Sequence, residues 1–255
     1  MNPFDLSGRV AVVTGANTGI GQAIAVALAQ AGADIVAIGR TRAEETAARI
    51  NTFGRTCTIV DADLSQAASA TEVGERAIGV FGHADILVNN AGIIRRADAT
   101  EFTIADWDAV MDTNVKTVFF LSQAIGRHMI ARHVDTGIRG KIINIASLLS
   151  FQGGIRVASY TASKSGVVGL TKLLANEWAS RGVNVNAIAP GYISTNNTEA
   201  LRSDEARNRQ ILDRIPEGRW GSPEDIGGGA VFLASDASDY VQGQVLAIDG
   251  GWLGR

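Results

Sequence analysis

The sequence has few of the residues on which several other classes of protein depend. Cys57 is the only cysteine among 255 residues, so neither an intrachain disulfide nor a thiolate metal cluster can form. The three histidines are His83, His128 and His133, and none is spaced from another as the i,i+4 ligands of a helical metal site are. The sequence therefore predicts no metal site, and it predicts that Cys57 is a buried small hydrophobic residue.

A surplus of positive charge and long apolar runs are also missing. The 23 basic and 26 acidic side chains give a net charge of -3, whereas nucleic-acid-binding proteins normally carry a basic surplus. No apolar run approaches the length of a membrane span, and residues 1–7 have no apolar core of signal-peptide length. These absences predict a cytoplasmic protein whose partners are neither nucleic acids nor membranes.

Short apolar runs are present, and they alternate with segments of helical periodicity. Runs such as residues 10–13, 35–38 and 86–88 are apolar on both faces, as in a parallel sheet that lies between two layers of helices. The length of the chain favours one α/β domain. We predict seven strands at 9–14, 34–39, 56–61, 84–88, 138–146, 183–189 and 244–249. We predict helices at 19–31, 42–53, 65–80, 104–132, 158–180 and 223–234.

Residues 191–220 differ from the rest because they are polar and follow a predicted strand. They include Asn196 and Asn197 and a charged stretch at 202–214. Ligands of open α/β sheets bind beyond the carboxyl ends of the strands. We therefore expect residues 191–220, the lid segment, to cover a substrate, although a solvated surface helix fits the same composition.

Glycines cluster directly after the first predicted strand, with the spacing G-x-x-x-G-x-G within residues 14–21. Glycine allows a tight turn and a close approach of the backbone to a pyrophosphate, whose charge then meets the N-terminus of the next helix. The pattern predicts a dinucleotide site. Its predicted contacts are Gly15, Asn17, Thr18, Gly19, Ile20 and Gly21.

The end of the second predicted strand bears on the choice of cofactor. It runs Gly39-Arg40-Thr41-Arg42 and lacks the acid that would bind a ribose 2′-hydroxyl. Arg40 or Arg42 fits a 2′-phosphate, which favours NADP over NAD, although both also fit a solvated helix start. Asp63, after the third strand, fits either a hydrogen bond from the adenine amino group or an N-cap.

Tyr160 and Lys164 lie one turn apart on a predicted helix and therefore share a face. A nearby ammonium lowers the pKa of a phenol, so the pair can act as acid or base on an alcohol and ketone couple. Ser147 follows a buried strand, where its hydroxyl can hold the substrate oxygen. Asn114 lies within a predicted helix that disfavours asparagine, which indicates a helix break that holds a water beside Lys164.

Together these motifs resemble the short-chain dehydrogenase/reductase family over nearly the whole chain. The resemblance rests on T-G-x-x-x-G-x-G at 14–21, N-N-A-G at 89–92, Ser147, Y-x-x-x-K at 160–164 and P-G at 190–191. It implies a single-domain Rossmann-type fold, with a doubly wound parallel sheet of seven strands and helices on both faces, and it implies a homotetramer. It also implies a nicotinamide-dependent oxidoreductase with the catalytic tetrad Asn114, Ser147, Tyr160 and Lys164. The further cofactor contacts that it implies are Leu64, Asn90, Ala91, Gly92, Tyr160, Lys164, Pro190, Gly191, Ile193 and Thr195.

Within the family, the sequence is similar to bacterial dehydrogenases of sugar acids through segments at 94–96, 150–156, 192–197, 215–216, 218–220 and 249–255. That similarity implies hydride transfer to or from a sugar acid or keto acid, and it favours NAD where Arg40 favours NADP. Arg95, Arg96 or Arg156 fits bidentate binding of the substrate carboxylate. The predicted substrate contacts are Arg95, Ser147, Gln152, Arg156, Tyr160, Tyr192 and Asn197.

Two other functions fit parts of the same pattern. A 3-oxoacyl-thioester reductase shares the tetrad but needs a basic, partly apolar surface for a carrier arm. A non-catalytic dinucleotide-binding protein needs only the glycine loop. The apolar residues 250–255, the C-terminal tail, are expected to be buried at a subunit interface.

Overall fold

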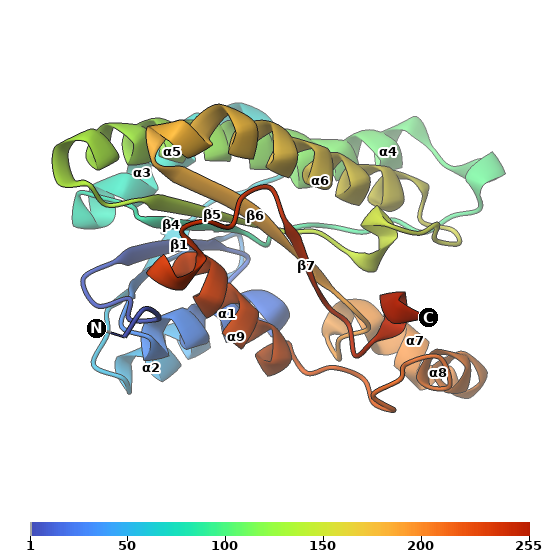
Figure 1. The fold of residues 1–255 in the computed structure, drawn as a ribbon. Coiled ribbons are helices and arrows are strands. Elements are labelled where there is room, and N and C mark those ends of the chain that lie inside the picture. The colour runs from blue at the N-terminus through green and yellow to red at the C-terminus, as the bar shows by residue number, and fades with distance from the viewer. Residues whose placement is uncertain (1) are drawn as a thin grey trace.

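The computed structural model describes residues 2–255 and joins seven parallel strands into one sheet, in the order β3-β2-β1-β4-β5-β6-β7 (Figure 1). The predicted α/β sheet is confirmed, and the predicted strand limits differ from the observed ones by no more than two residues. The strands are Val10–Thr14 (β1), Asp34–Gly39 (β2), Cys57–Asp61 (β3), Ile86–Asn89 (β4), Gly140–Ile145 (β5), Val183–Pro190 (β6) and Val245–Ile248 (β7).

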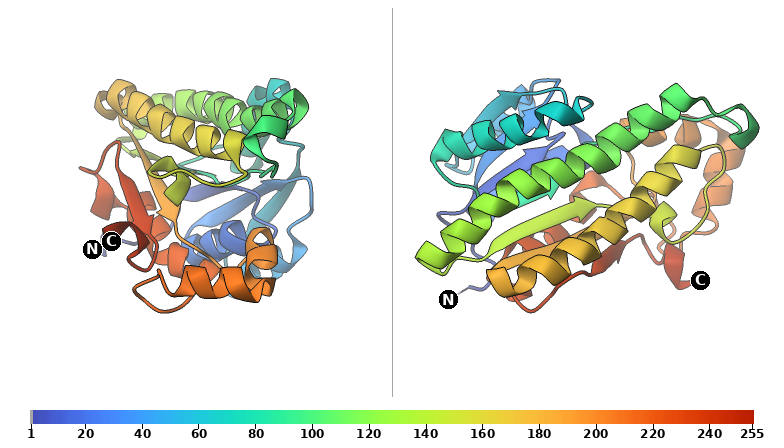
Figure 2. Two further views of the ribbon diagram at one scale, coloured as in Figure 1. Left: turned by 90° about the vertical axis from the view of Figure 1, so that its right-hand side faces the viewer. Right: turned by 90° about the horizontal axis from the view of Figure 1, so that it is seen from above.

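Helices cover both faces of the sheet, which makes three layers (Figures 1 and 2). One face carries α1 (Gly19–Gln30), α2 (Glu44–Asn51) and α9 (Gly227–Ala234). The other carries α3 (Ala70–Phe81), α4 (Ile104–Met111), α5 (Thr117–Thr136) and α6 (Ala158–Trp178). The lid segment contains two short helices, α7 (Glu199–Ser203) and α8 (Glu205–Leu212). In residues 2–255, no helix is both long and apolar enough to pass through a membrane.

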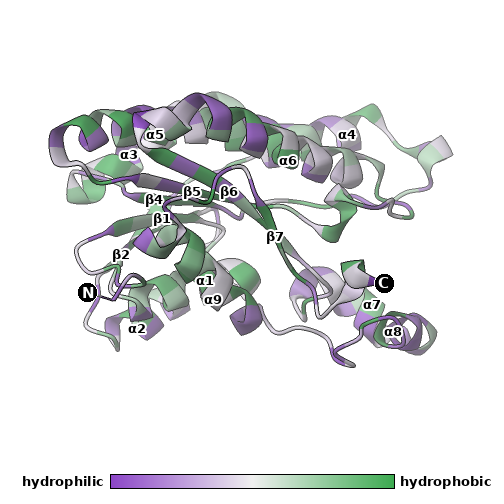
Figure 3. Cartoon of the chain, viewed as in Figure 1, coloured by the Kyte–Doolittle hydropathy of each residue, from purple (hydrophilic) through white to green (hydrophobic). Residues whose placement is uncertain are grey.

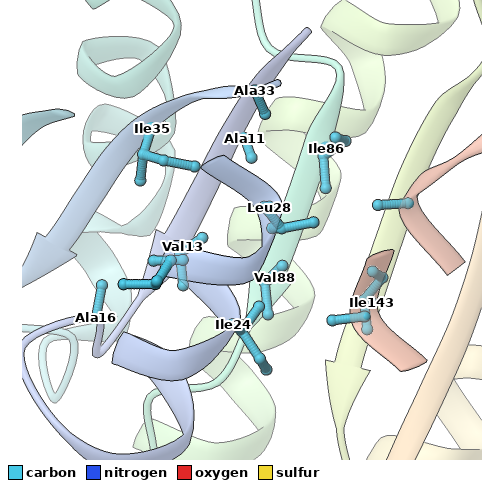
Figure 4. Close-up of a cluster of buried hydrophobic side chains, with 14 of the residues drawn as sticks. Ala11, Val13, Ala16, Ile24, Leu28, Ala33, Ile35, Ile86, Val88 and Ile143 are labelled. Carbon is cyan, nitrogen blue, oxygen red and sulfur yellow. The ribbon is translucent and has the colours of Figure 1, made fainter. Parts of the chain in front are cut away.

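The apolar residues of the strands serve two cores because neighbouring side chains point to opposite faces of the sheet. On one face, Val13 and Val88 pack with Ile24 and Leu28 of α1 (Figure 4). On the other, Val12 belongs to a second cluster beneath α3, α5 and α6. A sheet that is packed on both faces holds its strand ends, and the loops that follow them, in fixed positions.

A polar network runs through the second core close to the carboxyl ends of the strands. Asn89 Nδ2 of β4 donates to Ser122 Oγ at 2.9 Å and to Asn144 Oδ1 of β5 at 2.8 Å. Asn144 Nδ2 in turn donates to Thr171 Oγ1 of α6 at 2.9 Å. Figure 3 shows such hydrophilic residues within the otherwise hydrophobic strands β5 and β6. Satisfied buried polar groups of this kind fix the register of the elements that they join.

Two predictions about single elements need correction. Cys57 lies on the edge strand β3 and is only partly buried, because no further strand covers that side. The single helix predicted at 104–132 is divided by a π-helical turn at Asp112–Lys116, which separates α4 from α5.

A partly buried ion pair at the amino ends of the central strands β1 and β4 gives a test of the fold. The Asp85 side chain is 1% exposed, accepts from Val10 N at 2.9 Å and pairs with Arg132 Nε at 2.9 Å. Asp85→Ala should lower the free energy of unfolding by about 3 kcal/mol, because it leaves a partly buried guanidinium and a strand amide without their acceptor.

Chemical denaturation measures that loss, and Asp236→Ala is the matched control. Asp236 forms an exposed pair with Arg9 at 3.1 Å, and its removal should cost less than about 1 kcal/mol. Equal losses in the two variants would contradict the account.

Candidate active site

A cleft of about 380 Å³ opens beyond the carboxyl ends of β1 and β4, where the order of the strands reverses. Open α/β sheets bind their ligands at such a switch point. The cleft brings together residues that were predicted from separate motifs. The predicted residues that line it are Gly15, Asn17, Thr18, Gly19, Ile20, Gly21, Arg40, Asp63, Leu64, Asn90, Ala91, Gly92, Tyr160, Lys164, Thr195 and Asn197.

The glycine loop and the N-N-A-G motif form one unit. Asn90 Nδ2 donates to Thr14 O at 2.9 Å and to Gly15 O at 3.2 Å. A Cβ on Gly15 would lie 2.9 Å from that amide nitrogen, and one on Gly21 would overlap both the same nitrogen and Gly15 O. Gly15 also has a positive φ of 66°, which only glycine adopts readily. Any side chain at these two positions would separate β1 from β4.

The N-terminus of α1 is suited to an anion. Its N-cap residue, Thr18, makes no side-chain hydrogen bond to the helix, and the first turn contains no acidic residue. Backbone N–H groups at this end therefore keep their capacity to bind a pyrophosphate. Thr195 of the lid segment lies against the loop, since a Cβ on Gly19 would be 3.4 Å from Thr195 Cγ2. The glycine cradle and the free helix end fit a dinucleotide.

Only one of the two arginines after β2 lacks a carboxylate partner. Arg42 pairs with Glu44 Oε1 and with Asp61 Oδ2, both at 2.8 Å. Arg40 lines the cleft, is exposed and forms no ion pair within residues 2–255. Of the two arginines that the sequence left open, Arg40 is thus the one that fits a 2′-phosphate.

Asp63 is not the N-cap of the next helix, because that N-cap is Gln66, and its bond to adenine stays a prediction. Its carboxylate accepts from Ser65 N at 3.0 Å, and this hydrogen bond, with a smaller contribution from the charge of Arg40, lowers the pKa of Asp63. The residue therefore stabilises the turn after β3, and it also lines the cleft. A second carboxylate oxygen is left for a donor in the cleft.

Tyr160 and Lys164 share one face of α6 as predicted, with Lys164 Nζ 5.6 Å from the centre of the Tyr160 ring. Lys164 is 5% exposed, and its Nζ donates to Ile145 O at 2.6 Å. Burial lowers the pKa of Lys164 to about 8. Burial raises the pKa of Tyr160, while hydrogen bonding with Ser147 and the charge of Arg96 act in the opposite direction. The expected net lowering of the phenol pKa is therefore wrong for this structure, because desolvation dominates.

Asn114 lies within the π-helical turn and is 1% exposed. Its Oδ1 accepts from Ile93 N at 2.9 Å, and its Nδ2 donates to Ile93 O at 2.9 Å and to Ser163 Oγ at 3.2 Å. The predicted helix break is thus present. Asn114 fastens the segment after Gly92 to α6, while its role in holding a water stays a prediction.

Ser147 follows β5 in extended backbone and accepts from Leu149 N at 3.2 Å. Hydrogen bonding with the Ser147 side chain partly opposes the rise in the pKa of Tyr160, so the two side chains are neighbours. A ketone or alcohol oxygen placed between them could bond to both.

Two of the predicted carboxylate-binding arginines are already paired. Arg95 Nε lies 3.2 Å from Asp106 Oδ1, and Arg156 Nε lies 3.1 Å from Asp98 Oδ1. All four side chains are substantially exposed. The structure therefore disfavours Arg95 and Arg156 as partners of a substrate carboxylate.

Arg96 is different. Its Nη2 donates to Asn197 O of the lid segment at 3.1 Å, and it has no carboxylate partner within residues 2–255. Its charge makes the smallest contribution to the pKa of Tyr160 and partly opposes the rise that burial causes. Sequence reasoning included Arg96 without preferring it, because the pairing of its neighbours depends on contacts that sequence does not reveal.

Several predicted contacts lie away from the cleft. Pro190, Gly191 and Ile193 do not line it, and Ile193 is 4% exposed because its side chain turns into the core. Tyr192 packs against Trp220 and Trp252 instead, with ring centres 5.4 and 4.7 Å apart. Ile93 and Ile145 line the cleft but were not predicted, although each adjoins a motif residue.

Trp252 is the one buried residue of the C-terminal tail, and its own chain buries it. Trp252 is 4% exposed and packs with Leu148, Ile211 and Ile215. Its apolar character therefore does not require a subunit interface, which removes the reason for that expectation. The homotetramer stays a prediction.

Comparison with known proteins agrees with this site. Residues 15–253 match the family model described as Enoyl-(Acyl carrier protein) reductase. The 2-dehydro-3-deoxy-D-gluconate 5-dehydrogenase of Escherichia coli (strain K12) is 59% identical, over 100% of this chain and 99% of that protein. A 3-oxoacyl-[acyl-carrier-protein] reductase of Synechocystis is 40% identical, over 96% of this chain and 97% of its own length.

Solved structures give the same result. A protein of Agrobacterium tumefaciens assigned as a 2-deoxy-D-gluconate 3-dehydrogenase, with bound NADP, has 58% identity and a TM-score of 0.92, covering 100% of both chains. A gluconate 5-dehydrogenase of Burkholderia cenocepacia, in complex with NADP and tartrate, has 41% identity and a TM-score of 0.92, covering 100% of this chain and 98% of that one. With a matching family model over residues 15–253 and relatives more than half identical over its whole length, this chain belongs to the short-chain dehydrogenase/reductase family.

Proposed function

We propose that this protein is an NADP-preferring oxidoreductase that interconverts a secondary alcohol and a ketone of a sugar acid. The proposed pair is 2-dehydro-3-deoxy-D-gluconate and 3-deoxy-D-glycero-2,5-hexodiulosonate. The observation that carries the proposal is the Arg96 guanidinium, which donates to the cleft residue Asn197 and has no carboxylate partner within residues 2–255. Such a group favours a substrate with an anionic end near the reacting carbon. The names of the relatives in Escherichia coli and Agrobacterium tumefaciens support the same class of substrate.

The residues that would hold the cofactor are among those that line the cleft. The amides at the start of α1 and the glycine loop would bind the pyrophosphate, and Arg40 the 2′-phosphate. Asn114 keeps Ile93, and with it the floor of the cleft, in place. When bound, the nicotinamide supplies or accepts the hydride.

Side chains of the protein, and not the cofactor, would transfer the proton. A raised pKa keeps the Tyr160 phenol protonated near neutral pH, as a proton donor to the ketone oxygen must be. The Ser147 hydroxyl would donate a second hydrogen bond to that oxygen and so stabilise the negative charge that develops on it. Lys164, with a pKa of about 8, is mostly cationic at pH 7 and favours the phenolate that remains. Oxidation of the alcohol uses the same groups in reverse.

The lid segment would cover the bound substrate. Asn197 lines the cleft, and its carbonyl accepts from Arg96. Closure of such a segment excludes water and orients the substrate.

A substrate panel tests the function directly. Wild-type protein should oxidise NADPH in the presence of the diketo sugar acid, and Tyr160→Phe should reduce turnover by about 10²- to 10⁴-fold, because a positioned general acid contributes that much. NADPH affinity, measured by fluorescence titration, should stay within about twofold, since the phenol hydroxyl is a minor cofactor contact. Turnover of an acetoacetyl thioester but of no sugar acid would replace this proposal by a 3-oxoacyl-thioester reductase.

Cofactor preference should depend on Arg40. Arg40→Ala should lower kcat/KM for NADPH by about 10- to 100-fold and leave that for NADH nearly unchanged, because only the former loses a charge-assisted bond to phosphate. Arg42→Ala is the matched control, since Arg42 is held by Glu44 and Asp61. If Arg42→Ala causes the larger loss, the assignment is wrong.

Substrate affinity should depend on Arg96. Arg96→Met should raise KM for the sugar acid by about 10- to 100-fold, the effect of losing a charged partner of the carboxylate. Arg95→Met, at an arginine already paired with Asp106, should change KM by less than about threefold. Steady-state kinetics on both variants gives the two KM values. Similar KM values would show that Arg96 does not bind the substrate carboxylate.

A further inference from the structure

A small apolar cluster, separate from the two main cores, joins the C-terminal tail to the lid segment and to the loop after β5. Its buried members are Leu148, Ile211, Ile215 and Trp252. Leu148 directly follows Ser147, Ile211 belongs to α8, and Trp252 comes from the tail. The three parts are far apart in sequence, and Figure 1 shows the C-terminus beside α7 and α8. The far end of the lid segment is therefore packed against the neighbour of a tetrad residue.

The polar end of Trp252 has a specific partner. Its Nε1 donates to Gln152 Oε1 at 3.1 Å, and the guanidinium of Arg214 lies 4.0 Å from the centre of its ring. Gln152 lies in the loop that begins with Ser147; it does not line the cleft described above, and its contact with substrate is a prediction from the sequence. An indole can only donate, so it holds the amide oxygen of Gln152 and leaves the amide nitrogen, with its two donors, for other groups. Gln152 Nε2 donates to no other group within residues 2–255.

The tail is fastened to the lid segment at two further points. Arg255 Nη1 donates to Asp213 O at 3.1 Å and to Arg214 O at 3.3 Å, carbonyls just beyond the end of α8. Glu217 N donates to Gly250 O at 3.0 Å. Hydrogen bonds to carbonyls at a helix end replace those that the helix cannot make itself.

We propose that the C-terminal tail is a positioning element of the substrate site, in which Trp252 orients the Gln152 amide so that its nitrogen faces the substrate. The site then presents a hydrogen-bond donor at this position and selects a substrate that places an acceptor oxygen there, as a hydroxyl or carboxylate does. This inference rests on the proposed function, because it concerns the same substrate. Trp252 acts through Gln152 and touches neither substrate nor cofactor.

Trp252→Phe tests the proposal, because it removes the N–H donor and keeps an aromatic ring in the cluster. KM for the sugar acid should rise about three- to tenfold, the size expected when one orienting hydrogen bond is lost, with kcat and NADPH affinity within about twofold. Trp220→Phe is the matched control, since Trp220 Nε1 donates to Asn208 Oδ1 at 2.7 Å within the lid segment. A purely structural role would lower the melting temperature without a selective rise in KM.

A double-mutant cycle shows whether Trp252 acts through Gln152. In a Gln152→Met background, Trp252→Phe should leave KM unchanged, because the amide that it orients is gone. An unchanged KM for Trp252→Phe alone, or an equal rise in both backgrounds, would overturn the proposal.

Failure of the proposed function would be seen separately, as the absence of turnover of any sugar acid by the wild-type protein. In that case, the rate of backbone amide hydrogen exchange tests whether Trp252 holds the loop at 147–153 in place. Trp252→Phe should speed exchange at 147–153 and leave β1 unchanged. Unaltered exchange at 147–153 would overturn the inference.

Discussion

The contact of the Asn90 amide with the backbone of the glycine loop is the constraint on which the rest of the site depends. It requires that Gly15 and Gly21 lack side chains. It also fixes the distance between the loops that follow β1 and β4, at the point where the strand order reverses. The N-terminus of α1 then faces that gap with unpaired amides. Asn114 extends the same arrangement by tying the segment after Gly92 to α6, the helix that carries Tyr160. The glycine loop and Tyr160 thereby line one cleft.

Local pairing of charges decides which cations are free to meet a ligand. Arg42, Arg95 and Arg156 each have a carboxylate partner, whereas Arg40 and Arg96 have none in the part of the chain that the structure describes, residues 2–255. A cation that is already paired gains little by exchanging one carboxylate for another, while a free one gains a new charge-assisted bond. Arg40 lines the cleft beside the proposed 2′-phosphate site, and Arg96 contacts the cleft residue Asn197, where we propose that the substrate carboxylate binds. The same geometry accounts for both cofactor preference and substrate class.

Features that depend on local sequence were predictable, and features that depend on distant contacts were not. The strands followed from apolar runs, and the glycine loop and the Tyr160 and Lys164 pair followed from spacing along one element. The partners of Arg95 and Arg156 were not accessible, because either aspartate could equally have pointed to solvent. The raised pKa of Tyr160 was missed because the degree of burial outweighs a neighbouring charge. The burial of Trp252 depends on residues about 40 and 100 positions away, which no periodicity reveals.

A crystal structure of the protein with NADP and the hydroxy sugar acid would test the central claim most directly. The account predicts that the reacting oxygen lies within hydrogen-bond distance of both the Tyr160 hydroxyl and Ser147 Oγ, with the substrate carboxylate against the Arg96 guanidinium. A substrate whose carboxylate lies against Arg95 or Arg156, or whose reacting oxygen is remote from Tyr160, would contradict it.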